Sequence, residues 1–203
     1  MFPSTFPEVQ RYPELKRVLK DYIDMQFSDL RTLLKLPRKW ADLDAGQNFA
    51  TSAVLLNVVS GASVCFYNAN ISNLTTHGDR ATRFTGILRG FYPWGGDVRP
   101  TPQCISLLWE EARNPLAHSF GLTTPTTPDL KLAKSHLPHR RIMELEDSIT
   151  RPSWCEPTIF TTSLGKTGLS VPTLYWGVHR MLHKLFRDSA QVANAETFCT
   201  SIT

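Results

Sequence analysis

The sequence is poor in cysteine, with four cysteines at Cys65, Cys104, Cys155 and Cys199. They are far apart and form no CxxC pair, which argues against a zinc ribbon. So sparse a set does not make a disulfide scaffold either, and it is typical of a protein in a reducing compartment. We therefore expect a cytoplasmic protein.

The sequence also lacks a long uninterrupted hydrophobic run. Its first residues contain neither a basic segment nor an apolar one, so we expect no secretory signal. The longest apolar stretch, residues 53–67, is interrupted by the small and polar residues Asn57, Ser60, Gly61 and Ser63. This stretch is predicted to be too short and too polar to cross a membrane, so we expect no membrane partner.

A large excess of one charge is missing as well. Lysine and arginine together number 22 against 18 acidic residues, which gives a formal net charge of +4. A length of 203 residues and a hydrophobic content of 41% suit one soluble domain with a buried core. The small positive excess favours a polyanionic partner only weakly, because many basic proteins bind no nucleic acid.

Apolar residues recur at helical spacing in much of the chain. Pro13 suits the first turn of a helix, and Pro37 ends the pattern that begins there. The predicted helices cover residues 13–36, 44–67, 78–91, 101–113 and 172–187. We expect the first to bend near Phe27 and Ser28. The second is apolar on nearly all sides, which is typical of a central core helix.

The composition changes after the fourth helix. A linker-like run rich in threonine and proline precedes three short segments rich in strand-forming residues, at 130–134, 140–147 and 158–163. These segments predict a small antiparallel meander, followed by a turn at 165–168.

The expected fold class is mainly α: a helical bundle of about five helices with a small antiparallel β-meander inserted before the last helix. We expect a single domain over 1–203. Residues 12–122 would form the core helices, residues 123–168 a β-rich insertion and residues 170–190 a closing helix.

The most informative segment is 113–118, with the sequence Arg-Asn-Pro-Leu-Ala-His. On an unbroken helix, Arg113 and His118 would not share a face. Pro115 lacks a backbone donor and disfavours helical geometry at Asn114, so the helix should end or kink there. A break at this point can direct Arg113 and His118 into one groove.

This segment resembles the signature of the HEPN superfamily, small helical-bundle proteins of which many are metal-independent ribonucleases. In that signature an arginine, a polar residue and three further residues precede a histidine, and Arg113, Asn114 and His118 match these positions. The resemblance implies a HEPN-like bundle, no cofactor, and a homodimer that brings two motifs to one cleft. It also implies a toxin or defence role with an antitoxin or regulator as a partner. Toxin-like members have a tyrosine that a partner nucleotidyltransferase modifies, whereas this chain has Phe120.

The implied activity is endoribonucleolytic cleavage of RNA to a 2′,3′-cyclic phosphate. RNA supplies its own nucleophile, the 2′-OH, so the reaction needs a proton acceptor, a proton donor and a cation for the phosphorane. His118 can serve either proton role near neutral pH, and Arg113 offers a bidentate cation to phosphate oxygens. Asn114 would orient the phosphate or His118.

A simpler interpretation of the same residues stays open. Glu110 and Arg113 are spaced for an ion pair on the helix surface, and Trp109 lies one turn before Arg113 and can stack on it. Asn114 would then be only a helix cap. Under this alternative the chain is a non-catalytic helical module that binds a nucleotide, RNA or a protein partner.

Two further basic sets have both a functional and a structural interpretation. On the last predicted helix, His179 and four further residues form a stripe that suits RNA backbone or a solvated face: Arg180, His183, Lys184 and Arg187. His179 and His183 have the spacing of a zinc pair, but Arg180 between them would repel a cation, so we expect no metal. On the third helix, Arg80, Arg83 and Arg89 could face a nucleic-acid groove or solvent, and solvent exposure is the default expectation.

Overall fold

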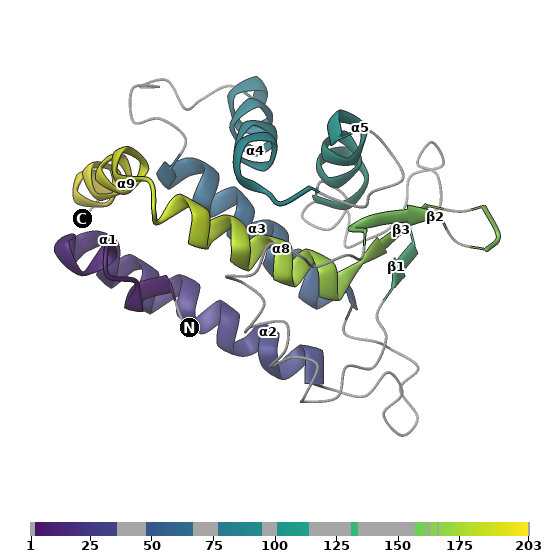
Figure 1. The fold of residues 1–203 in the computed structure, drawn as a ribbon, viewed down its shortest axis with the longest axis horizontal. Helices are drawn as coiled ribbons and strands as arrows, with labels where there is room; N and C mark the ends of the chain where they lie inside the picture. The colour runs from purple at the N-terminus through teal and green to yellow at the C-terminus, as the bar shows by residue number, and fades with distance from the viewer. Residues whose placement is uncertain are drawn as a thin grey trace.

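A computed structural model of the chain shows a mainly helical protein with a small three-stranded sheet at one end (Figure 1). The structure describes residues 3–35, 48–66, 77–94, 101–113, 131–133, 157–161, 163–165 and 167–202. The predicted strand at 140–147 and the predicted linker after the fourth helix lie outside the described residues.

The first predicted helix is confirmed, but its irregular part lies elsewhere. Helix α1 (Pro13–Val18) continues through a π-helical segment, η3 (Leu19–Asp24), into α2 (Met25–Lys35). The helix is predicted to bend near Phe27, whereas its departure from α-helical geometry comes earlier, at η3. Two short 3₁₀ turns precede the helix, η1 (Pro3–Thr5) and η2 (Val9–Arg11). Its buried residues follow the predicted helical spacing: Leu15, Leu19, Phe27, Leu30 and Leu34.

Helix α3 (Asn48–Phe66) is the central helix that the apolar pattern predicts. Helices α2, α4, α8 and α9 all pack against it. Within the described part of the chain it is also the one helix long and apolar enough to cross a membrane, with a mean hydropathy of 1.7. The argument that this stretch is too short and too polar for a span was therefore wrong. Half of the apolar window is buried inside the protein, which is typical of a core helix.

Two more helices cover α3. Helix α4 (His77–Phe91) packs on α3, and its buried residues include Phe84, Ile87 and Leu88. Helix α5 (Thr101–Ser106) continues into a second π-helical segment, η4 (Leu107–Arg113), which also contacts α3 and α4. Both helices agree with the predicted spans. π-Helical turns are rare and frequently occur at functional sites, and η4 ends at Arg113, the arginine of the predicted motif.

The sheet differs from the predicted antiparallel meander. Strand β3 (Thr167–Ser170) lies in the middle, between β1 (Lys131–Ala133) and β2 (Ile159–Thr161). It pairs antiparallel with β2 but parallel with β1. Of the turn predicted at 165–168, Gly165 has a positive φ of 73°, whereas Thr167 and Gly168 belong to β3. Pairing of β3 with β2, which lies just before it in the chain, and with the more distant β1 extends the strand over part of the predicted turn.

The last part of the chain forms two helices, whereas the sequence predicted one. Helix α8 (Val171–Leu185) is the predicted closing helix, and the Ser170 hydroxyl caps it by accepting a hydrogen bond from the Thr173 amide. A further helix, α9 (Ser189–Ile202), follows it. The Asp188 carboxylate accepts hydrogen bonds from the amides of the first turn of α9, at 3.0 and 3.1 Å. This capping aspartate is the sequence signal that predicts α9, and it was missed.

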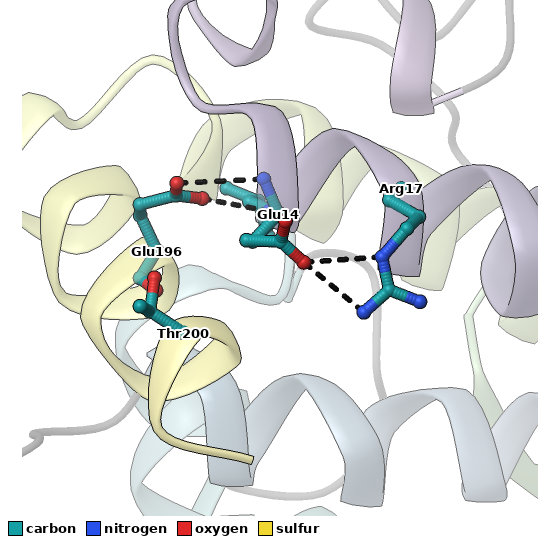
Figure 2. A network of polar contacts seen from close by, with 5 residues as sticks. Glu14, Arg17, Glu196 and Thr200 are labelled. Carbon is teal, nitrogen blue, oxygen red and sulfur yellow. Dashed lines mark hydrogen bonds and ion pairs between the residues drawn. The ribbon is translucent and has the colours of Figure 1, made fainter. Parts of the chain in front are cut away.

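Helix α9 closes against the start of α1, so the two ends of the chain are joined (Figure 2). The Glu196 carboxylate accepts hydrogen bonds from the backbone amides of Glu14 at 3.4 Å and Leu15 at 2.7 Å. A negative charge at a helix N-terminus is favourable because unpaired amides and the helix dipole both point there. Beside this contact, Arg17 pairs with Glu14 at 3.0 Å, and the Thr200 hydroxyl donates to the Glu196 carbonyl at 2.9 Å.

Tyr92 joins the end of α4 to the sheet and to α8. Its hydroxyl lies 2.8 Å from the Thr158 hydroxyl and donates to the Thr173 carbonyl at 3.5 Å. The ring packs directly on Gly177, where a side chain would overlap it. These contacts hold residues 91–93 in place beside α8.

Candidate functional site

Arg113, the arginine of the predicted motif, lies at the last residue of η4 and is half-buried. Its guanidinium carbon is 4.9 Å from the centroid of the Trp109 ring, which confirms the predicted stacking. Trp109 in turn packs on Phe84 of α4, with the ring centroids 5.1 Å apart. This stack limits where the guanidinium can point, so Arg113 is a positioned group rather than a freely rotating surface side chain.

Arg113 contributes to a pocket of about 310 Å³ between α3, α4 and η4. We call it the arginine pocket, because three of its lining residues are arginines and none of the described lining residues is acidic. The lining residues are Ser60, Gly61, Ser63, Val64, Arg80, Arg83, Phe84, Trp109 and Arg113. A concave surface with several guanidinium groups and no carboxylate in its described walls attracts anions.

Arg83 is the deepest of the three arginines, with only 3% of its surface exposed. Its Nε is buried and has no hydrogen-bond partner within the described residues. Arg80 is exposed and completes the same wall, whereas Arg89 is exposed and is not part of the pocket. The default expectation of solvent exposure for these residues was therefore wrong for Arg83. A sequence signal existed, because Arg83 stands four residues before the buried Ile87.

The pocket places like charges close together. Burial lowers the pKa of Arg113, and the positive charge of Arg80 lowers it further. Arginine remains protonated in proteins, so the lowered pKa reports the electrostatic cost of the arrangement rather than a loss of charge. A bound anion would relieve that cost, because it offsets both the lost hydration and the mutual repulsion.

The other two residues of the predicted catalytic set, Asn114 and His118, lie outside the described residues. The convergence of Arg113 and His118 on one groove, and the break at Pro115, therefore remain predictions. What the structure adds is the surroundings of Arg113, which the motif alone did not indicate.

A second basic pocket, also of about 310 Å³, lies between the end of α4 and α8. We call it the basic groove. It contains all four predicted RNA-binding residues of α8 together with an aromatic wall: Phe91, Tyr92, Pro93, Arg180, His183, Lys184 and Arg187. Lys184 donates to the Gly90 carbonyl at 2.9 Å, and the Arg180 guanidinium lies 5.5 Å from the Trp176 ring. The prediction that these four residues share one surface is confirmed.

His179 does not belong to that surface. It is 4% exposed, and its ring packs at 4.7 Å, centroid to centroid, against Phe27. The helix turns it into the core between α8 and α2, so its place in the predicted basic stripe was wrong. Among the described residues, no cluster of three or more His, Cys, Asp or Glu side chains could hold a metal ion.

The surroundings of His183 in the basic groove disfavour its protonated form. Burial lowers the pKa of His183 from its ordinary value of 6.5, the charges of Arg187 and Arg180 lower it further, and Glu8 opposes them. The unfolded chain therefore binds this proton more tightly than the folded protein does. The neutral imidazole stabilises the fold above about pH 6.5, and this contribution is lost as the pH falls below that value.

The basic groove predicts a measurable effect on RNA binding. Arg187→Gln removes an exposed positive charge that makes no described structural contact, so RNA affinity should fall similarly for all RNA sequences. The slope of the logarithm of affinity against the logarithm of salt concentration should become shallower by about one. Lys20→Gln, an exposed lysine on η3 outside both pockets, is the matched control. Equal salt slopes for wild type and Arg187→Gln, measured by fluorescence anisotropy, would show that RNA does not bind along the basic groove.

Together, the described residues define a mainly helical protein with two basic pockets that meet α4. No protein-family model matches the chain. Comparisons with curated proteins and with solved structures also found no match. The argument for a function therefore depends on this chain's own residues.

Proposed function

We propose that this protein is a HEPN-like, metal-independent endoribonuclease that cleaves RNA at a phosphate held by Arg113. The observation that supports the proposal is the position of Arg113. The residue selected by the motif lies in a pocket with two further arginines and no acidic residue among its described walls. A surface arginine that serves only an ion pair needs no such surroundings.

Arg113 would contact the non-bridging oxygens of the scissile phosphate. Its planar guanidinium can donate two parallel hydrogen bonds to them, and the stack on Trp109 keeps it oriented. The charge on the phosphate grows as the 2′-OH attacks, so a fixed cation stabilises the transition state more than the ground state.

His118 would act as the general acid or base of the reaction, and Asn114 would orient the phosphate or His118. Because one chain supplies one such histidine and the reaction uses both a proton acceptor and a proton donor, we propose a homodimer with two motifs in one cleft. The basic groove would bind RNA backbone away from the cleaved bond, since phosphate contacts give affinity without sequence readout.

A second candidate function is binding of RNA or a nucleotide without cleavage. The specific observation in its favour is the Nε of Arg83, which is buried and has no hydrogen-bond partner within the described residues. A bound anion would satisfy this donor without any cleavage. The two functions differ in what happens to the RNA after it is bound.

The test is incubation of the protein with end-labelled RNA in excess EDTA, followed by analysis of the new ends. We expect internal cleavage that EDTA does not slow, with 2′,3′-cyclic phosphate and 5′-hydroxyl ends. RNA that is bound but stays intact, with or without added divalent metal, would support the binding module and refute the nuclease.

A further inference from the structure

We propose that Arg83 and Arg80 form a binding site for a terminal phosphate group, the phosphomonoester at the 5′ end of an RNA or on a nucleotide. The site lies in the same arginine pocket as Arg113, but phosphate binding by Arg83 and Arg80 does not depend on cleavage by Arg113 and His118.

The first support is the state of Arg83. A guanidinium presents five N–H donors and no acceptor, so a buried arginine needs acceptor oxygens around it. Arg83 is almost fully buried, its Nε has no partner within the described part of the chain, and it lines an open pocket. A tetrahedral oxyanion is the ligand that supplies acceptors to several guanidinium donors at once.

The two serines in the pocket do not offer their hydroxyl hydrogens to a ligand. The Ser60 hydroxyl donates to the Leu56 carbonyl at 2.9 Å, and the Ser63 hydroxyl donates to the Ser60 carbonyl at 2.7 Å. Both hydroxyl hydrogens are therefore used within α3. The other side-chain donors among the described lining residues are the guanidinium groups and the indole N–H of Trp109.

The number of charges selects the kind of phosphate. A phosphomonoester carries close to two negative charges at neutral pH, whereas an internal phosphodiester carries one. Arg83 and Arg80 together match the two charges of a monoester. An internal diester would supply only one negative charge to this pair of arginines.

The size and the wall of the pocket agree with such a ligand. A volume of about 310 Å³ is at the small end of the range for ligand pockets, which suits a phosphate with part of its nucleoside. Phe84 and Trp109 add an apolar surface to the same wall.

The experiment compares one short oligoribonucleotide with either a 5′-phosphate or a 5′-hydroxyl end. Binding is measured by fluorescence anisotropy with His118→Ala protein, so that cleavage does not consume the RNA. We expect the phosphorylated RNA to bind about tenfold more tightly or better, because two charge-assisted contacts are added. Inorganic phosphate should compete for binding of the phosphorylated RNA.

Variants on α4 locate the effect. Arg83→Met and Arg80→Gln should each reduce the preference for the 5′-phosphate, whereas Arg89→Met, an exposed arginine on the same helix outside the pocket, should retain it. Circular dichroism shows whether Arg83→Met folds. If Arg83→Met does not fold, the Arg80→Gln variant, at an exposed position, tests the proposal.

The outcomes separate this inference from the proposed nuclease. Equal affinity for the two RNA ends, or a preference that survives in both Arg83→Met and Arg80→Gln, would overturn the terminal phosphate site even if the wild type cleaves RNA. A preference for the phosphorylated end in a protein that cleaves nothing would support the site and refute only the nuclease.

Discussion

Replacing His118 with alanine is expected to lower the rate constant for RNA cleavage by about 10²–10⁴-fold, with little change in RNA affinity. The imidazole is the only group of the motif that can accept or donate a proton near neutral pH, since Arg113 stays protonated and Asn114 does not titrate. The phosphate contacts that hold the RNA come from arginines and remain in the variant. The loss should therefore fall on the chemical step.

Single-turnover cleavage in EDTA measures that step directly, and anisotropy measures affinity in parallel. His136→Ala is the matched control, a histidine outside the motif, and it should cleave like the wild type. Arg113→Lys separates geometry from charge, because lysine retains the charge and loses both the bidentate contact and much of the stack on Trp109. It should also cleave slowly. Wild-type rates in His118→Ala would leave the proposed mechanism without its proton transfer.

Gly177→Ala is expected to destabilise the protein by about 1–3 kcal/mol, the usual cost of overpacking a core. Alanine is normally favoured over glycine inside a helix by about 1 kcal/mol, so intrinsic propensity predicts the opposite sign. Here packing decides, because a Cβ on Gly177 would overlap the hydroxyl and ring of Tyr92. To make room, Tyr92 must give up its hydrogen bond with Thr158, which links α4 to the sheet.

Urea denaturation followed by circular dichroism gives the free energy of unfolding for this variant. Gly90→Ala on α4 is the control, since a Cβ there meets no atom within 4 Å, and it should be neutral or slightly stabilising. The melting temperature of Gly177→Ala should fall by about 2–4 °C for each kcal/mol lost. An unfolding free energy equal to that of the wild type would show that the Tyr92 ring is free to move aside.

The helices could be predicted well because their signal is local. The apolar spacing after Pro13, the charge-free stretch that became α3 and the stripe around Ile87 each report which residues face a core, whatever that core contains. Helix α9 was missed for a related reason. Its buried residues are few and small, namely Val192, Ala195 and Cys199, so its clearest local signal is the Asp188 cap.

The sheet could not be predicted from local patterns. Strand β1 pairs parallel with β3, and a long stretch of chain that includes β2 separates the two. Parallel pairing needs such a crossover, and nothing in three strand-forming residues indicates the partner or its direction. The local pattern predicted strands where β1 and β2 lie, but it missed the central strand β3, and the tertiary structure determined how the three pair.

The candidate site divides in the same way. The sequence alone determined the motif position of Arg113, its stacking partner one turn earlier on the helix, and the spacing that places four basic residues of α8 on one surface. Only the tertiary structure decided that Arg80 and Arg83 share a pocket with Arg113 and that His179 belongs to the core. Helical spacing shows which residues share a face, because it is set by the geometry of one helix. Whether that face meets water or another helix depends on segments far away in the chain.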